Sequence, residues 1–293
     1  MTEPSGQGHD LGTFGLLLEL FPHPHLSNLA LRLITAIVGL PLIFLVVWVG
    51  GFPFAIIMAA VAFLAATEFV HGWLLTSLPI PTALRHAPLY AIVPAVVVGA
   101  HLDPGYLWLG VGFAALFAFL GYTPTNAFGP RKPFRVLSWC VVYIGILGST
   151  FVLVRDVPDG REWVALAILS TFAVDTGAFA VGKAIGRHKM APRISPGKTW
   201  EGAVGGYVAG VAACFGLNVL FDTGLPATTL MHLAFALPVF AQAGDLFESA
   251  LKRRMGVKDA SGLLPGHGGF LDRLDSLLFV MPLVYLFVRL RVL

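Results

Sequence analysis

The chain has 293 residues, of which 57% are hydrophobic and 12% are charged, and its mean hydropathy is +0.81. Soluble domains average about 45–50% apolar and about 25% charged residues, so a soluble globular fold is excluded. The formal charge of +3 at pH 7 first indicates membrane topology, and not nucleic-acid binding, because Lys and Arg concentrate in the cytoplasmic loops of polytopic membrane proteins. Cys140 and Cys214 lie in apolar runs without metal-binding spacing, so we expect them in the core.

The hydropathy pattern predicts an all-α integral membrane protein. A helix needs about 17–25 apolar residues to cross a hydrocarbon core about 30 Å thick. The sequence contains nine candidate stretches, near 29–49, 52–70, 88–102, 106–122, 136–154, 162–183, 203–221, 227–249 and 274–290. Eight spans remain an alternative, because the third stretch is short and only Gly50 and Gly51 separate the first two. Segment 11–21 is too short to span and is interpreted as interfacial or loosely ordered.

The distribution of Lys and Arg predicts a cytoplasmic N-terminus. In that orientation 15 of the 19 Lys and Arg residues fall on the cytoplasmic side, in agreement with the positive-inside rule. The other four are Arg155, Arg161, Arg289 and Arg291. We divide the chain into an N-terminal segment (1–27), a transmembrane scaffold (28–155) with little intramembrane charge beyond Glu68, and a transmembrane catalytic region (156–293). Both long polar loops of the catalytic region then face the cytoplasm.

Three carboxylates fall within predicted helices of the catalytic region: Asp175, Asp245 and Glu248. A charged side chain at a helix centre costs about 2.5–3.5 kcal/mol on insertion scales, so it normally faces the protein interior or a water-filled cavity. A structural ion pair with Lys183 or Lys252 is the alternative. For Asp175 the two interpretations are balanced, whereas the charged neighbours of Asp245 favour function.

A second pair of acids, Asp272 and Asp275, begins the last predicted helix after the turn Gly266-His267-Gly268-Gly269. Residues three apart share a helix face, so both carboxylates can address one cation. Mg²⁺ is typically held by one or two carboxylates together with waters and substrate phosphates. A lone pair of this kind could simply complement the helix dipole. With Asp245 on the preceding helix as a third acid, a metal site is favoured.

The loop 193–202, with the sequence RISPGKTWEG, supplies Ser195, Lys198 and free backbone N–H groups before a helix. A Walker A motif is rejected, because Pro192 stands where that motif needs glycine and no strand is expected before the loop. A phosphate cradle at the helix start is the functional interpretation. An ordinary positive-inside loop is the alternative.

Further cations precede the acids of the last helix: Lys252, Arg253, Arg254 and Lys258. Alone they would indicate topology, but a triphosphate with its metal requires both signs of charge within a few ångströms. His267, between glycines, is interpreted as a phosphate contact, with acid–base chemistry and turn capping as alternatives.

The segment 249–275 resembles the signature of the phosphatidate cytidylyltransferase (CDP-diacylglycerol synthase) family. The matching positions are Ser249, Leu251, Lys252-Arg253, Lys258-Asp259, Ser261, Leu264, Pro265, His267-Gly268-Gly269, Phe270, Asp272-Arg273, Leu274 and Asp275. The upstream segments Asp175-Thr176 and 195–202 are also similar, so the resemblance covers roughly 170–290. One departure is Val174, where many members carry Asn.

This resemblance implies transfer of a cytidylyl group from CTP to phosphatidate at the cytoplasmic face of a bacterial inner membrane, with Mg²⁺ as cofactor, a second cation possible, and a homodimer as the expected assembly. It implies that the catalytic residues are Asp245, Asp272, Asp275, Lys252 and Arg253, with the three acids as metal ligands. The implied substrate-binding residues are Asp175, Ser195, Lys198, Thr199, Ser249, Lys258, His267 and Arg273.

Two alternatives to this function stay open. A related enzyme could use CTP on another lipid, as a lipid-alcohol kinase or an archaeal-lipid cytidylyltransferase. A cation transporter would use Asp175 and Asp245 as ion ligands, but the dense loop cations would repel its substrate.

Overall fold

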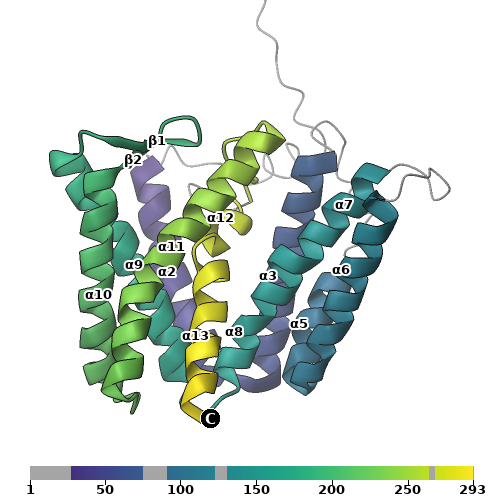
Figure 1. Cartoon of the computed structure of the whole chain (residues 1–293), viewed down its shortest axis with the longest axis horizontal. Coiled ribbons are helices and arrows are strands. Elements are labelled where there is room, and N and C mark those ends of the chain that lie inside the picture. The colour runs from purple at the N-terminus through teal and green to yellow at the C-terminus, as the bar shows by residue number, and fades with distance from the viewer. Residues whose placement is uncertain (1–27, 75–90, 123–130, 264–267, 293) are drawn as a thin grey trace, which may run out of the picture.

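The computed structural model describes residues 28–74, 91–122, 131–263 and 268–292, which form a bundle of helices that run side by side, with one small hairpin at one end (Figure 1). The helices are α2 (Asn28–Val49), α3 (Gly51–Leu74), α5 (Ile92–Leu102), α6 (Leu107–Tyr122), α7 (Arg131–Cys140), α8 (Leu147–Arg155), α9 (Gly160–Ile185), α10 (Trp200–Phe221), α11 (Ala227–Met255), α12 (Leu271–Leu274) and α13 (Leu277–Val292). Two short helical turns are η1 (Pro104–Tyr106) and η2 (Val141–Ile146), and the strands are β1 (Lys189–Ala191) and β2 (Ser195–Thr199).

The prediction of a helical membrane protein is confirmed. Within the described ranges, six helical segments have the length and apolar composition to cross a membrane: Gly51–Trp73, Pro104–Tyr122, Lys132–Arg155, Gly160–Ile185, Trp200–Phe221 and Ala227–Met255. Every stretch expected from the sequence coincides, over most of its length, with helical structure. The count of nine spans stays a prediction, and segment 11–21 lies outside the described residues.

The first two expected stretches are separate helices because the chain turns at a pair of glycines. Gly50 and Gly51 have φ values of +63° and +56°, a conformation that side chains with a Cβ disfavour. α7, η2 and α8 instead follow one another without a break, and η2 is a π-helical turn. Such turns inside α-helices often occur near functional sites.

The outer faces of the bundle are strongly apolar, as a lipid environment requires. Val219, Trp108 and Leu220 are 81%, 75% and 72% exposed, although each is a large hydrophobic side chain. The interior is filled by fully buried residues from both halves of the chain, such as Trp163 and Leu278. Because α13 packs against both α8 and α11, the last helix joins the two halves.

Glycines allow α9 and α10 to pack closely along their length. A Cβ at Gly206 would lie 2.7 Å from the carbonyl oxygen of Val174, and one at Gly177 would lie 2.5 Å from the Cβ of Ala209. These distances are shorter than van der Waals contact, so small residues are required wherever two helices approach this closely. The two helices therefore form a fixed wall beneath the hairpin.

The hairpin corrects one sequence expectation, because a strand does precede the Ser-Pro-Gly-Lys-Thr segment. β1 pairs with β2 in antiparallel fashion, with Lys189 opposite Thr199 and Ala191 opposite Ser195. The carboxylate of Glu201 closes its base by accepting from the backbone N–H groups of Arg187 and His188. Strands this short carry little periodic signal in the sequence. Their position is set by contacts to the start of α10, such as those of Glu201.

Candidate active site

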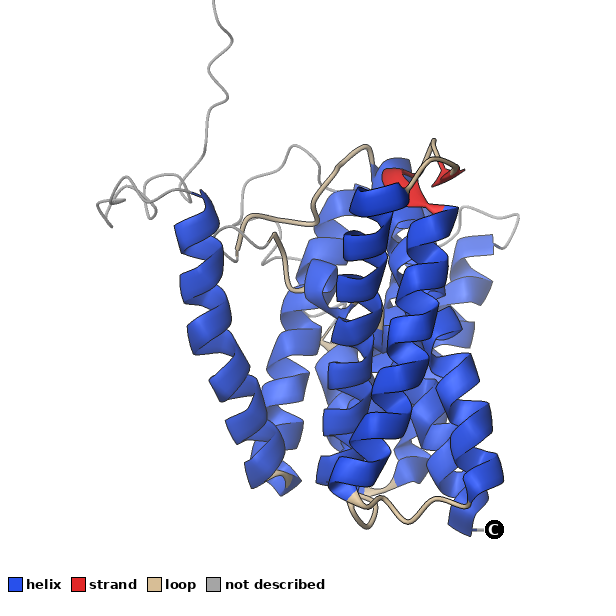
Figure 2. Cartoon of the chain, turned by 90° about the vertical axis from the view of Figure 1, so that its left-hand side faces the viewer, coloured by secondary structure: helices blue, strands red, loops and turns tan. Residues whose placement is uncertain are grey.

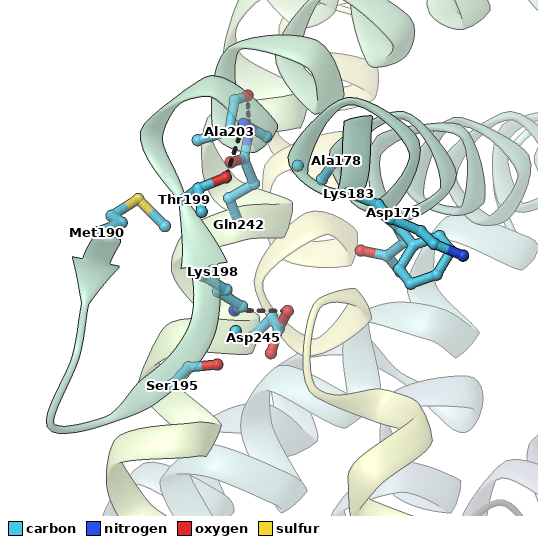
Figure 3. Close-up of a pocket in the computed structure, with 14 residues that line it drawn as sticks. Asp175, Ala178, Lys183, Met190, Ser195, Lys198, Thr199, Ala203, Gln242 and Asp245 are labelled. Carbon is cyan, nitrogen blue, oxygen red and sulfur yellow. Dashed lines mark hydrogen bonds and ion pairs between the residues drawn. The ribbon is translucent and has the colours of Figure 1, made fainter. Parts of the chain in front are cut away.

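A pocket of about 460 Å³ lies where α9, α10 and α11 meet the hairpin (Figure 3). The hairpin that borders the pocket lies at the same end of the bundle as the C-terminal end of α11 (Figure 1), and Figure 2 shows its two strands at that end. The lining residues of the pocket are Asp175, Ala178, Phe179, Gly182, Lys183, Met190, Ser195, Gly197, Lys198, Thr199, Gly202, Ala203, Gln242 and Asp245. The pocket thus brings together residues that are up to 70 positions apart in the chain.

An ion pair between the hairpin and α11 crosses this pocket. The Nζ atom of Lys198 lies 2.6 Å from Oδ2 of Asp245, and the two side chains are 24% and 30% exposed; Figure 3 draws them pointing toward each other. Thr199 ends the strand and caps α10, because its Oγ1 accepts from the N–H of Gly202 at 3.1 Å. Such caps stabilise a helix start by about 1 kcal/mol. The cap fixes where β2 ends and therefore where Lys198 points.

Asp275, at the junction of α12 and α13, is not among the residues that line the pocket. It interacts electrostatically with Asp245 and Asp175, and its own Oδ1 accepts from the N–H of Ser276 at 2.6 Å. Like charges repel each other, so an added cation would stabilise these acids. Three acids from α9, α11 and the α12–α13 junction thus share one electrostatic environment.

Asp272 has a different environment from Asp275, although only three residues separate them. Its Oδ1 lies 2.6 Å from Nζ of Lys252, and its Oδ2 accepts from the N–H groups of Gly269 at 2.7 Å and Ala260 at 3.0 Å. Burial tends to raise the pKa of the Asp272 carboxyl, but the hydrogen bonds from Lys252 and Gly269 outweigh it and hold that pKa below its usual range. Asp272 therefore stabilises the loop before α12 by accepting hydrogen bonds from its backbone.

Asp272 and Asp275 have different partners because the backbone between them is not one continuous helix. α12 is a single turn of four residues, and Asp275 lies beyond its end, before α13 begins at Leu277. The two acids consequently do not lie on one face of one continuous helix. Among the residues that the structure describes, no group of three or more His, Cys, Asp or Glu side chains is arranged to hold a metal ion. The three-acid ligand set of Asp245, Asp272 and Asp275 stays a prediction.

A sequence model of the Cytidylyltransferase family matches residues 30–291. The chain belongs to this family. It is 33% identical over 254 residues to the phosphatidate cytidylyltransferase of Staphylococcus saprophyticus. This match covers 86% of this chain and 96% of that relative. The enzyme of the same name from Bacillus subtilis is 32% identical over 262 residues, covering 88% and 97%. The resemblance inferred from the segment 249–275 is therefore confirmed.

The structure describes most of the other residues expected to bind substrate in this cytidylyltransferase. Arg253 is exposed and donates to the carbonyl oxygens of Ile194 at 3.1 Å and Val257 at 3.4 Å. The hydroxyl of Ser249 lies 3.5 Å from Oδ1 of Asp245, the long limit of a hydrogen bond. Lys258 and Arg273 are exposed, so their charges are accessible from solvent. His267 lies outside the described residues.

Lys252 belongs to a buried network and is not a free surface cation. Besides Asp272, its Nζ contacts Oε2 of Glu248 at 2.6 Å, and the side chains of Lys252 and Glu248 are 13% and 0% exposed. The alternative of a structural ion pair, considered for the intramembrane acids, is thus realised between Glu248 and Lys252.

Lys183 and Gln242 line the pocket, although sequence reasoning did not assign them to the site. A further missed residue of the cytidylyltransferase is Glu68 on α3. It contacts the loop that carries the Gly268-Gly269 pair. The only signal available was that Glu68 is an acid inside an apolar helix, and that signal names no partner.

Proposed function

We propose that this cytidylyltransferase transfers a cytidylyl group from CTP to phosphatidate, forming CDP-diacylglycerol and pyrophosphate. Family membership and similarity to named phosphatidate cytidylyltransferases over most of the chain support this reaction. The observation that carries it to this site is the pocket in which Lys198 of the hairpin meets Asp245 of α11. A pocket with both signs of charge suits a nucleoside triphosphate and its cation.

The reaction requires alignment more than proton transfer. An oxygen of the phosphatidate phosphate attacks the α-phosphorus of CTP, and a new P–O bond forms. The bond from the α-phosphorus to the oxygen that bridges to the β-phosphate breaks, and pyrophosphate leaves with that electron pair. The attacking oxygen is already anionic, so no general base is needed. Catalysis then rests on positioning the two phosphates and neutralising their charge.

The chain's own cations are proposed to bind the phosphates. Lys198 and Ser195 on β2 face the pocket, while Arg253, Lys258 and Arg273 are exposed cations. An ammonium acts as a point charge, whereas a guanidinium can bind two phosphate oxygens at once. Lys252 forms ion pairs with Glu248 and Asp272, and is proposed to hold α12 against the C-terminal end of α11.

Mg²⁺ is the proposed cofactor, and the donor set fits it. Asp245 and Asp275 are like charges that interact electrostatically, and two carboxylates with waters and phosphates are a common Mg²⁺ environment. Asp272 is the least supported of the three expected ligands, because both of its oxygens already accept hydrogen bonds. Bound there, the cation would neutralise charge on the reacting phosphates.

We place the protein in a bacterial inner membrane, with nine spans, a cytoplasmic N-terminus and the pocket facing the cytoplasm. The scaffold (28–155) and catalytic region (156–293) are proposed as its two parts. The hairpin and the C-terminal end of α11, whose sequences carry many of the Lys and Arg residues, lie at the same end of the bundle (Figure 1), which supports this orientation by the positive-inside rule. A homodimer is proposed from the family resemblance, and light scattering of the purified protein would test it.

The reaction is tested with the purified full-length protein in detergent, labelled CTP, Mg²⁺ and phosphatidate. We expect labelled CDP-diacylglycerol, with no product when Mg²⁺ is chelated. Matched reactions replace phosphatidate with a lipid alcohol or with an archaeal-type lipid phosphate. Product from one of these acceptors and none from phosphatidate would refute the proposed acceptor, and absence of any product would refute the activity.

A further inference from the structure

The loop before α12 is held from the opposite half of the protein by one buried carboxylate. Glu68 lies on α3 and is only 5% exposed. Its Oε1 accepts from the hydroxyl of Ser261 at 2.6 Å and from the N–H of Phe270 at 3.0 Å, and its Oε2 accepts from the N–H of Leu271 at 2.8 Å. All three contacts use Glu68 as an acceptor. They join residues about 200 positions apart in the chain.

The loop backbone packs directly on this carboxylate. A Cβ at Gly269 would lie 2.6 Å from each oxygen of Glu68, and a Cβ at Gly268, where φ is +78°, would lie 2.6 Å from Oδ2 of Asp272. Contacts that short are sterically forbidden, so each glycine provides space for one carboxylate. The Gly-Gly pair therefore fits between an acid from α3 and an acid from α12.

The same backbone leads into the charged network of the site. The N–H of Gly269 donates to Asp272, whereas the next two N–H groups donate to Glu68. Asp272 in turn holds Lys252, which also contacts Glu248. The α12 turn that follows ends at Leu274, immediately before Asp275. The position of Asp275 relative to Asp245 thus depends on a loop that Glu68 fixes.

We propose that Glu68 is a positioning residue for nucleotidyl transfer: the scaffold half orients the Gly268–Leu271 loop through this carboxylate and thereby places Asp272, Lys252 and Asp275. The inference rests on the proposed function for its catalytic consequence. The 28–155 region is then part of the site's architecture and not only a lipid-facing support.

The decisive variant is Glu68→Gln, which keeps the size of the side chain and removes one acceptor. An amide has a single acceptor oxygen, and its NH₂ group would face a backbone N–H donor. We expect turnover to fall by about 10- to 100-fold, as when a supporting partner of a metal site is removed. Thr67→Val is the matched control, since Thr67 Oγ1 donates only to the carbonyl of Leu64 within α3, and its turnover is expected within about twofold of wild type.

Two readouts separate positioning from general stability. Hydrogen exchange should accelerate in peptides covering 260–276 of Glu68→Gln and stay unchanged in α9 and α10, because the lost contacts are local. Ser261→Ala, which removes one of the three donors to Glu68, should lower turnover by a smaller factor than Glu68→Gln.

The inference is overturned if Glu68→Gln turns over within twofold of wild type, or if exchange accelerates equally in all helices. A larger loss of turnover for Ser261→Ala than for Glu68→Gln would also overturn it. The exchange measurement needs no substrate, so it tests the loop contact even if the wild type forms no CDP-diacylglycerol. Failure of the proposed function and failure of this inference are therefore distinguishable.

Discussion

Replacing Lys252 by methionine should destabilise the folded protein strongly, because two buried carboxylates would lose their shared counter-ion. Nζ of Lys252 lies 2.6 Å from both Glu248 Oε2 and Asp272 Oδ1. Removing one partner of a buried ion pair costs about 3–5 kcal/mol. Asp272 keeps two backbone N–H donors, whereas Glu248 is 0% exposed and keeps no hydrogen-bond donor among the described residues. The cost should therefore arise mainly at Glu248.

This assignment predicts a specific rescue. The double variant Lys252→Met/Glu248→Gln should recover most of the lost stability, because a neutral amide is far less costly to bury than an unpaired carboxylate. Lys252→Met/Asp272→Asn should recover less. Unfolding of the four proteins by a denaturing detergent in mixed micelles measures the differences. A loss below about 1 kcal/mol for Lys252→Met, or equal recovery in both double variants, would refute the reasoning from burial.

Three further outcomes are expected. Asp275→Asn should insert into the membrane normally yet lose activity by about 10²-fold or more, as a lost metal ligand would; near-normal turnover would contradict the metal role. Gly269→Ala should lower turnover by about tenfold or more, because its Cβ would meet the Glu68 carboxylate at 2.6 Å, whereas Gly262→Ala, with no atom within 4 Å, should match wild type. The depressed pKa of Asp272 contributes stability that is present above its unfolded pKa of about 3.9 and lost as the pH falls through its lower folded value. Asp272→Asn should thus flatten the acid limb of a thermal-stability profile, and parallel profiles would argue against it.

The helices could be predicted from sequence because the signal is local. Long runs without charge, such as the one that becomes α10, can satisfy their backbone in a membrane only as helices. Part of the site could also be predicted, since Asp175, Ser195, Lys198 and Asp245 do line one pocket. Each was conspicuous as a polar residue beside or within an apolar segment.

The remaining features depend on contacts between distant segments. The hairpin rests on a three-residue strand, too short to leave a period in the sequence. Asp272 and Asp275 were expected to share one helix face, but α12 ends after a single turn, and the two side chains take different partners. Glu68 stood alone in its helix, and nothing near it in sequence pointed to the backbone of Phe270 and Leu271.

The ion pair between Lys198 and Asp245 has a consequence for the order in which ligands can bind. The ammonium occupies a carboxylate oxygen that a metal ion would also use, so it serves as an internal stand-in for that ion. With Mg²⁺ and CTP bound as proposed, Lys198 would exchange this carboxylate oxygen for a phosphate oxygen, and Asp245 would be released to hold the cation. Each ligand should therefore tighten the binding of the other by the same factor, as thermodynamic linkage requires.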